Sequence, residues 1–286
     1  MDDGIIGLLG GAPPPLKIVD VGAMDIGAPP YARLLDLAGA TVIGFEPNPE
    51  ECDKLNAKGL ASHRYVPHFV GDGRARTFHW CSWAATSSLY PPNRPLLERF
   101  SDLPELVVVK ETSEVATTRL DDIEACKGAD YVKIDVQGAT LDVLRGGPET
   151  IGNALVVQCE VEFVQLYEGE PLFAEIDQEM RKLGFLLHQF APMATRTFAP
   201  LKRKPGAPSH GQVLWSDAIY ARSFLELGKL SATELLKLAI ILERQYQSRD
   251  FALLALQYHD EKTGGSLWDS YSTLLTGKIK DKPPLL

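Results

Sequence analysis

The segment from residue 16 to residue 46 constrains the fold more than any other part of the chain. Its sequence, LKIVDVGAMDIGAPPYARLLDLAGATVIGFE, predicts a short strand, a glycine-bearing turn, a helix and a second strand that ends at Glu46. Short apolar runs such as residues 16–21 are typical of parallel strands buried on both faces. An acid at the tip of the second strand can accept two hydrogen bonds from a ribose diol. This βαβ unit therefore predicts a site for an adenosine-containing cofactor.

The turn after the first strand indicates which cofactor to expect. A dinucleotide site typically carries the pattern G-x-G-x-x-G, whereas this turn runs from Gly22 to Gly27, with Asp20 before it and Asp25 inside it. Two carboxylates would repel a pyrophosphate and would suit a cationic ligand. S-adenosylmethionine carries a sulfonium and an ammonium group, so the turn favours a methyl donor. An ordinary turn in another Rossmann-like protein is the alternative.

Length and composition indicate a globular protein with one large domain, or one domain with an extension. The chain has 286 residues, of which 45% are hydrophobic and 23% charged, and its formal net charge is −9. An acidic chain of this kind does not indicate a nucleic-acid partner. The four cysteines lack metal-binding spacing, no secretory signal is visible, and no apolar run reaches the length of a membrane span. We therefore expect a cytoplasmic protein with reduced thiols and no membrane span.

Alternating strands and helices continue to residue 222. Further strands are expected at residues 65–70, 77–83, 131–136 and 154–163, followed by two strands without an intervening helix at 186–191 and 212–221. Alternating units of this kind predict a seven-stranded, mostly parallel α/β sheet, and the last two strands predict an antiparallel C-terminal β-hairpin. We expect a catalytic domain at residues 1–222 and a helical extension at residues 223–286.

The extension is too apolar for a free appendage in solvent. Its helices are expected either to pack on the domain or to present a surface for a homodimer or a biosynthetic partner. Two loops, at residues 86–105 and 192–212, are polar or rich in proline and glycine. Loops of this length are often lids or binding loops, so the acceptor substrate is expected to bind there.

The ordered motifs of the chain resemble those of the FkbM-type methyltransferases. They are, in chain order, VDVGA at 19–23, GFEPNPE at 44–50, SSLY at 87–90, TRLDD at 118–122, KIDVQG at 133–138, EVEF at 160–163, LYEG at 166–169 and DAIY at 217–220. Each motif is weak alone, but the ordered set is specific and spans about residues 16–222. The resemblance implies a Rossmann-like class I methyltransferase fold and S-adenosylmethionine as cofactor. It also implies methyl transfer to a hydroxyl of a sugar, glycan or polyketide-type small molecule.

The resemblance further implies roles for individual positions. The cofactor-binding candidates are, in chain order, Asp20, Gly22, Ala23, Glu46, Pro47 and Asp72. The first three would line the methionine part, the acid after the second strand would hold the ribose, and the last would bind the adenine amino group. The turn has one residue more than the common family form, and Asp25 is a further cofactor-binding candidate within it. Gln137 stands where many members carry glutamate, which removes a candidate acid.

An aliphatic hydroxyl is a poor nucleophile, so a positioned base is expected near the methyl donor. Candidates stand at strand ends: Asp135, with Lys133 on the same strand face, and Glu160, which shares a face with Glu162. A neighbouring lysine would lower the pKa of Asp135 and make it a weaker base. Glu160 is therefore the preferred base and Asp135 an orienting or binding group; a purely structural lysine–aspartate pair is the alternative. Acids on these strands could bind a divalent cation, but their spacing matches no recognised site and no metal ligand is assigned.

Two other functions stay open at this point. A nicotinamide-dependent oxidoreductase would share the Rossmann-like architecture, although the missing G-x-G-x-x-G pattern argues against it. A methyltransferase fold could also bind its ligand without turnover and recruit a partner through the helical extension. The acids retained at Asp20, Glu46, Asp72 and Asp135 favour a working enzyme over such a binding module.

Overall fold

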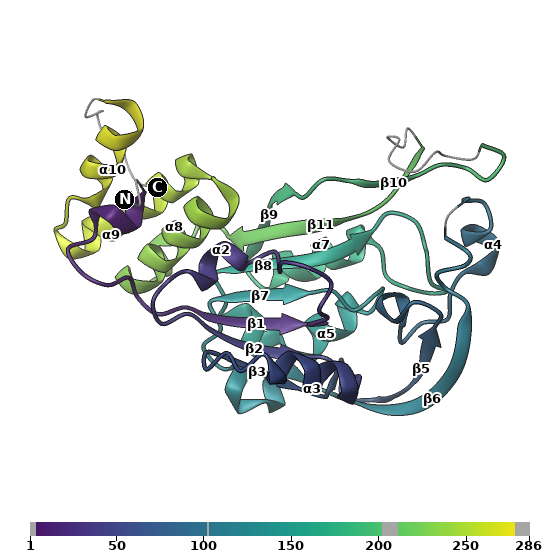
Figure 1. Cartoon of the computed structure of the whole chain (residues 1–286). Coiled ribbons are helices and arrows are strands. Elements are labelled where there is room, and N and C mark those ends of the chain that lie inside the picture. The colour runs from purple at the N-terminus through teal and green to yellow at the C-terminus, as the bar shows by residue number, and fades with distance from the viewer. Residues whose placement is uncertain (1–3, 102, 202–210, 278–286) are drawn as a thin grey trace.

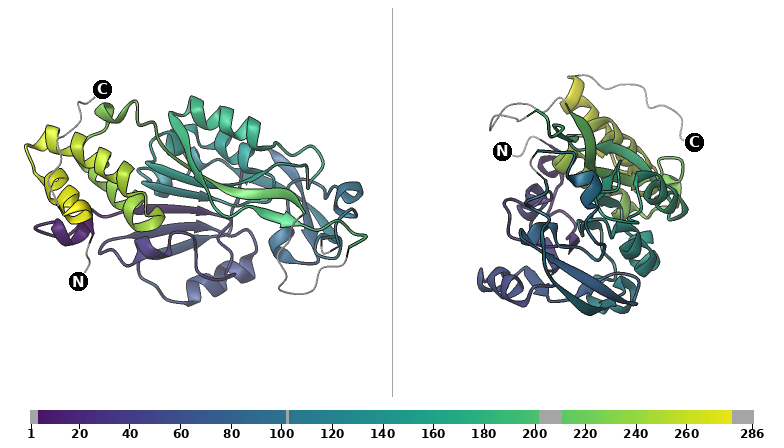
Figure 2. Two further views of the ribbon diagram at one scale, coloured as in Figure 1. Left: turned by 90° about the horizontal axis from the view of Figure 1, so that it is seen from above. Right: turned by 90° about the vertical axis from the view of Figure 1, so that its right-hand side faces the viewer.

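The computed structural model describes residues 4–101, 103–201 and 211–277. Figure 1 shows a central sheet, a cluster of C-terminal helices near the end where β1 begins, and a smaller sheet beyond the end where β1 finishes. The views in Figure 2 show the same order along the molecule. The space beyond the carboxyl end of β1 is therefore enclosed partly by the small sheet.

The central sheet is mostly parallel and confirms the predicted Rossmann-like fold class, although it has eight strands among the described residues instead of the predicted seven. Its strands are β1 (Lys17–Val21), β2 (Thr41–Phe45), β3 (His63–Val66), β7 (Tyr131–Ile134), β8 (Val156–Glu162), β9 (Phe185–Phe190), β10 (Ala194–Arg196) and β11 (Gln212–Arg222). Strands β3, β2, β1, β7 and β8 lie side by side in parallel, and β11 pairs antiparallel with β8 and β9. The expected hairpin of β9 and β11 is present. The short strand β10 pairs with β11 and was not expected from the sequence.

The strand expected at residues 65–70 is broken in two. β3 ends at Val66 and β4 (Phe69–Val70) begins after Pro67, which has no N–H group to donate to a strand partner. β4 joins a separate sheet with β6 (Val109–Thr118) and β5 (Ala75–Cys81), in the order β4-β6-β5. The strand expected at residues 77–83 corresponds to β5. The chain therefore leaves the central sheet at Pro67.

The described helices are α1 (Ile5–Leu8), α2 (Ala32–Leu35), α3 (Pro49–Ala57), α4 (Arg94–Leu97), α5 (Thr140–Gly146), α6 (Pro148–Gly152), α7 (Phe173–Lys182), α8 (Ala232–Tyr246), α9 (Arg249–Thr263) and α10 (Leu267–Thr276). Some of them cover the two faces of the central sheet, whereas α4 lies near the small sheet (Figure 1). Successive strand residues face opposite sides. Accordingly, Ile18 and Tyr131 pack with the C-terminal helices, whereas Val19 and Val132 pack with α5 and α7.

The C-terminal helices pack against the domain. α8 begins with a capping box, in which the Ser231 hydroxyl accepts a hydrogen bond from the Glu234 N–H and Glu234 accepts one from the Ser231 N–H. α8 contacts α2 and α9, and α10 contacts α9 and α1. Across the described ranges, we find no helix with both the length and the apolar character needed to cross a membrane.

Candidate active site

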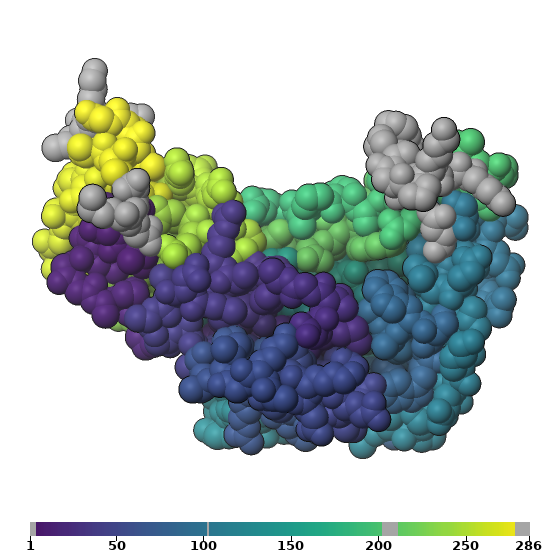
Figure 3. Space-filling view, viewed as in Figure 1, coloured from purple at the N-terminus to yellow at the C-terminus, as the bar shows by residue number. Residues whose placement is uncertain are grey.

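A cavity of about 290 Å³ lies at the carboxyl ends of β1, β2 and β7. This is the crevice in which open α/β sheets bind their ligands. Its walls come from the turn after β1, the residues after β2, the small sheet, the 3₁₀ turn Ala84–Thr86 and the residues after β7. Figure 3 shows the surface hollowed between the purple N-terminal segment and the blue segment near residue 90.

Gly22 allows β1 and β7 to approach closely at the floor of the cavity. Its φ of +84° is in the left-handed region, and a Cβ at this position would lie 1.8 Å from the carbonyl oxygen of Asp135. A side chain would therefore force the two strand ends apart. The Gly22 N–H donates to the Phe45 carbonyl, which joins the turn to the end of β2 as well.

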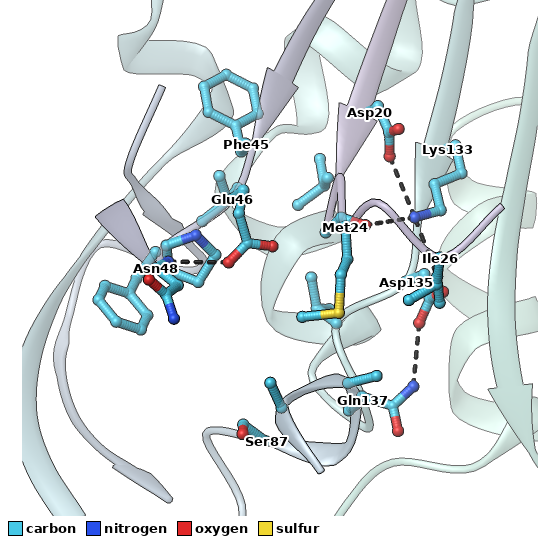
Figure 4. Close-up of a pocket in the computed structure, with 18 of the residues that line it drawn as sticks. Asp20, Met24, Ile26, Phe45, Glu46, Asn48, Ser87, Lys133, Asp135 and Gln137 are labelled. Carbon is cyan, nitrogen blue, oxygen red and sulfur yellow. Dashed lines mark hydrogen bonds and ion pairs between the residues drawn. The ribbon is translucent and has the colours of Figure 1, made fainter. Parts of the chain in front are cut away.

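Glu46 presents a buried carboxylate to the cavity. Its side chain follows β2 and lines the wall, although the residue is only 4% exposed. Oε1 accepts a hydrogen bond of 2.9 Å from the Asn48 N–H, and Figure 4 shows the second oxygen pointing into the cavity. Burial raises the pKa of Glu46, while the Asn48 N–H acts in the opposite direction. One oxygen is thus fixed by the backbone and the other points into the cavity.

Lys133 links the two acids at the ends of β1 and β7. Its Nζ lies 3.1 Å from Oδ1 of Asp20 and 3.7 Å from Oδ2 of Asp135, and it donates to the Gly22 carbonyl at 2.6 Å. Burial alone would lower the pKa of Lys133, but the two carboxylates together raise it. The lysine therefore stays charged and fixes the positions of both acids. The second oxygen of Asp20 accepts a hydrogen bond of 2.6 Å from the Tyr31 hydroxyl.

Gln137 lies between Asp135 and Glu160. Its Nε2 donates to Oδ1 of Asp135 at 3.0 Å and to Oε2 of Glu160 at 2.8 Å. Its Oε1 accepts from the Tyr167 hydroxyl, and its backbone carbonyl accepts from Ser88 Oγ. The residue has a φ of 51°, which non-glycine residues adopt rarely. Four hydrogen bonds hold it there, so its amide fixes the orientation of both acids.

The placement of Glu160 does not favour its predicted role as base. Asp135 lines the cavity and its side chain is 36% exposed, whereas Glu160 is not among the described residues that line it. Burial, and then the nearby Asp135, raise the pKa of Glu160 well above its ordinary value. Glu160 does not reach the cavity because Gln137 lies between them: the Gln137 amide donates a hydrogen bond to Glu160, and Gln137 itself lines the cavity.

Three other predicted residues are not among the described residues lining the cavity. Ala23 is buried, and Asp25 forms an ion pair of 2.7 Å with Lys58 with its side chain 45% exposed. Asp25 therefore does not line the cavity beside Asp20, and its contact with the cofactor stays a prediction. Asp72 pairs with Arg76 at 2.9 Å, because β4 has left the central sheet and turned this acid toward the small sheet. Its predicted contact with an adenine amino group does not match this position.

Several cavity residues were not predicted, among them Met24, His68, Phe69 and Phe78. Ser87 and Leu89, which also line the cavity, belong to the loop that was expected to bind the acceptor. The rings of Phe69 and Phe78 lie 4.9 Å apart and those of Phe78 and Trp80 4.7 Å apart, forming an aromatic wall. Phe78 and Trp80 alternate along β5 and so share one face, which is the signal that could have identified them.

The arrangement offers a pocket of negative charge with an aromatic wall. Among the described residues that line it, the charged side chains are Asp20, Glu46, Lys133 and Asp135. The described lining of the cavity therefore carries three carboxylates and one lysine, which is an excess of negative charge. Within the ranges that the structure describes, no three histidine, cysteine, aspartate or glutamate side chains form a group that could hold a metal ion.

Comparison with known proteins identifies the family. The methyltransferase FkbM domain family matches residues 20–187. The 2-O-methyltransferase NoeI of Sinorhizobium fredii is 31% identical over 175 residues, which cover 56% of this chain and 69% of the relative.

Solved structures give more distant likenesses. The precorrin-6y C5,15-methyltransferase of Geobacter metallireducens has a TM-score of 0.38 at 14% identity, covering 77% of this chain and 86% of that one. The ribosomal protein L11 methylase of Lactobacillus delbrueckii has a TM-score of 0.36 at 14% identity, covering 77% and 74%. The family match spans more than half of the chain, and the curated relative agrees with it. The chain belongs to the FkbM methyltransferase family.

Proposed function

We propose that this protein is an S-adenosylmethionine-dependent O-methyltransferase that acts on a hydroxyl of a sugar, glycan or polyketide-type small molecule. Membership of the FkbM family supports methyl transfer, and the relative named as a 2-O-methyltransferase supports an oxygen acceptor. The observation that carries the proposal is the cavity at the strand ends, with the Glu46 carboxylate directed into it.

The residues around the cavity fit S-adenosylmethionine. This cofactor supplies an activated methyl group on a positively charged sulfur, and the excess of carboxylates over lysine suits a cation. The free oxygen of Glu46 can accept hydrogen bonds from ribose hydroxyls. The aromatic wall of Phe69, Phe78 and Trp80 offers flat apolar surface for a purine, in place of the predicted Asp72 contact.

Asp135 is the base that this arrangement favours. Asp135 follows β7, and its side chain is exposed to the cavity. Its orientation is fixed because Gln137 donates a hydrogen bond to one carboxylate oxygen and Lys133 lies near the other. A positioned base typically accelerates such a reaction about 10²- to 10⁴-fold. Asp135 can therefore accept a proton from an acceptor hydroxyl that binds beside it in the cavity.

Isothermal titration calorimetry on the purified chain tests the cofactor. We expect S-adenosylmethionine to bind with micromolar affinity and NAD⁺ to give no binding heat. If a well-folded chain binds NAD⁺ and not S-adenosylmethionine, the proposal is wrong and the oxidoreductase alternative gains support.

A second assay separates an enzyme from a binding module. The chain is incubated with methyl-labelled S-adenosylmethionine and a pool of hydroxylated sugars and polyketides. Transfer of label to an acceptor supports catalysis. Tight cofactor binding without transfer to any compound of the pool would instead favour the non-catalytic alternative.

A further inference from the structure

We propose that the last turn of helix α8 positions the cofactor cavity through Gln245 and Tyr246. The inference rests on the proposed S-adenosylmethionine site. It assigns a role in cofactor binding to the C-terminal extension, which lies beyond the family match at residues 20–187. Two separate sets of contacts lead from this turn to the cavity wall.

The first set reaches the wall directly. Nε2 of Gln245 donates a hydrogen bond to the carbonyl of Pro30, and Pro30 lines the cavity. The preceding residue, Arg244, donates from Nε to the carbonyl of Arg33 at 3.0 Å and lies 3.7 Å from Asp36. The end of α8 therefore contacts the chain at several points between residues 30 and 36.

The second set is a buried triangle of polar side chains. The Tyr246 hydroxyl lies 2.8 Å from that of Tyr131 and donates to Oε1 of Gln158 at 2.9 Å, and Tyr131 reaches the same oxygen at 3.0 Å. Nε2 of Gln158 donates to Asp217 at 2.7 Å. Tyr131 and Gln158 are buried, so a hydrogen bond lost from the triangle is not replaced by one to water.

The triangle connects to the acids of the cavity through one aromatic contact. The ring of Tyr131 meets that of Tyr31 edge to face, with 6.0 Å between centroids. The Tyr31 hydroxyl donates to Asp20, which in turn pairs with Lys133. Gln158 is also the register partner of Lys133 on the neighbouring strand. Displacing Tyr246 would thus disturb both partners of the cavity's ion pair.

The turn between β1 and α2 depends on such anchors. Residues 22–31 form no helix or strand, and Ile26 within them is 63% exposed. Its residues 25–28 are exposed, so the segment is positioned mainly by its two ends, here β1 and the residues held by α8, and by the ion pair of Asp25 with Lys58. Fixing a binding segment before the ligand arrives reduces the entropy cost of binding. α8 therefore acts on affinity for the cofactor as well as on stability.

Two variants and a matched control test this role. Gln245→Ala removes the contact to Pro30, and Tyr246→Phe removes only a hydroxyl. Tyr258→Phe removes a hydroxyl from another buried tyrosine of the extension, on α9 beside Gly228. Calorimetry with S-adenosylmethionine and amide hydrogen exchange of residues 24–34 without ligand are the two readouts.

We expect Gln245→Ala and Tyr246→Phe each to bind S-adenosylmethionine about three- to tenfold more weakly than the wild type, the range for one lost hydrogen bond. Exchange at residues 24–34 should be faster in both. The Tyr258→Phe control should bind like the wild type.

Unchanged affinity in both variants would overturn the inference, and so would an equal loss in the control. Failure of the proposed function has a different signature, since the wild type itself would then not bind S-adenosylmethionine. In that case hydrogen exchange decides: faster exchange in the two variants supports the positioning role, and unchanged exchange contradicts it.

Discussion

Glu162 and Glu170 are buried carboxyl groups beside the backbone of Gly138, just after the residues that line the cavity. Among the described residues, Oε2 of each acid has no hydrogen-bond partner. Burial raises the pKa of Glu170 to about 8, and burial followed by the charge of Glu170 raises that of Glu162. Two such groups are tolerated when they retain a proton between them.

Glu170→Gln should flatten the pH dependence of stability. A carboxyl whose pKa rises from 4.5 in the unfolded chain to about 8 in the folded chain stabilises the fold below pH 4.5. That contribution is lost as the pH rises through 8. Urea unfolding of the wild type should therefore show a free energy that falls between about pH 5 and pH 8, and the variant should show a smaller fall. The exposed Glu168→Gln is the control; parallel curves for all three proteins would refute the expectation.

Residues at strand ends were the easiest part of the site to predict. Asp20 lies near the end of the apolar strand β1, Glu46 and Asp135 follow β2 and β7, and the carboxyl ends of parallel strands meet at one edge. The relation between Asp135 and Glu160 could not be predicted, because it depends on the left-handed backbone of Gln137. No local sequence pattern predicts a left-handed backbone conformation in a residue other than glycine.

At the scale of elements, the small sheet was the main omission. β6 was not predicted because most of its residues are exposed, so the alternation of apolar and polar residues that marks a half-buried strand is missing. Pro67 was a visible signal that the third strand ends early, but only the pairing of β4 with β6 shows where the chain goes next. The loops expected to bind the acceptor include residues 102 and 202–210, which lie outside the described residues.

Asp72→Asn tests the position of the turn between β4 and β5. The carboxylate pairs with Arg76, which also contacts Asp142, so the variant should lose about 1 kcal/mol of stability. Because this acid lies outside the cavity lining, affinity for S-adenosylmethionine should stay within about twofold of the wild type. Thermal unfolding and calorimetry measure the two quantities. A loss of affinity of tenfold or more would restore Asp72 as an adenine contact.

At the scale of the whole molecule, one hydrophobic core joins the sheet to the C-terminal helices. Ile18 and Tyr131 of the sheet belong to the same buried cluster as Leu238 of α8 and Leu256 of α9. The apolar character of residues 223–286 predicted that these helices are not free in solvent. Which surface they cover could not be predicted, because an apolar helix face fits a second chain as well as its own domain.

Leu238→Ala should destabilise the entire chain. The side chain is fully buried, and truncations of this kind cost about 2–5 kcal/mol. Because the core is continuous, circular dichroism and tryptophan fluorescence should report one coincident transition in urea. The exposed Leu225→Ala should change stability by less than about 0.5 kcal/mol. A separate early transition in Leu238→Ala would mean that residues 223–286 unfold as their own unit.

The central claim is that the cavity at the ends of β1, β2 and β7 binds S-adenosylmethionine through Glu46. Calorimetry of the wild type, Glu46→Ala and Glu50→Ala tests it most directly; Glu50 is an exposed acid four residues away on α3. Glu46→Ala should bind at least about tenfold more weakly, because hydrogen bonds to a charged group are lost, and Glu50→Ala should bind like the wild type. A folded Glu46→Ala protein with wild-type affinity would contradict the account.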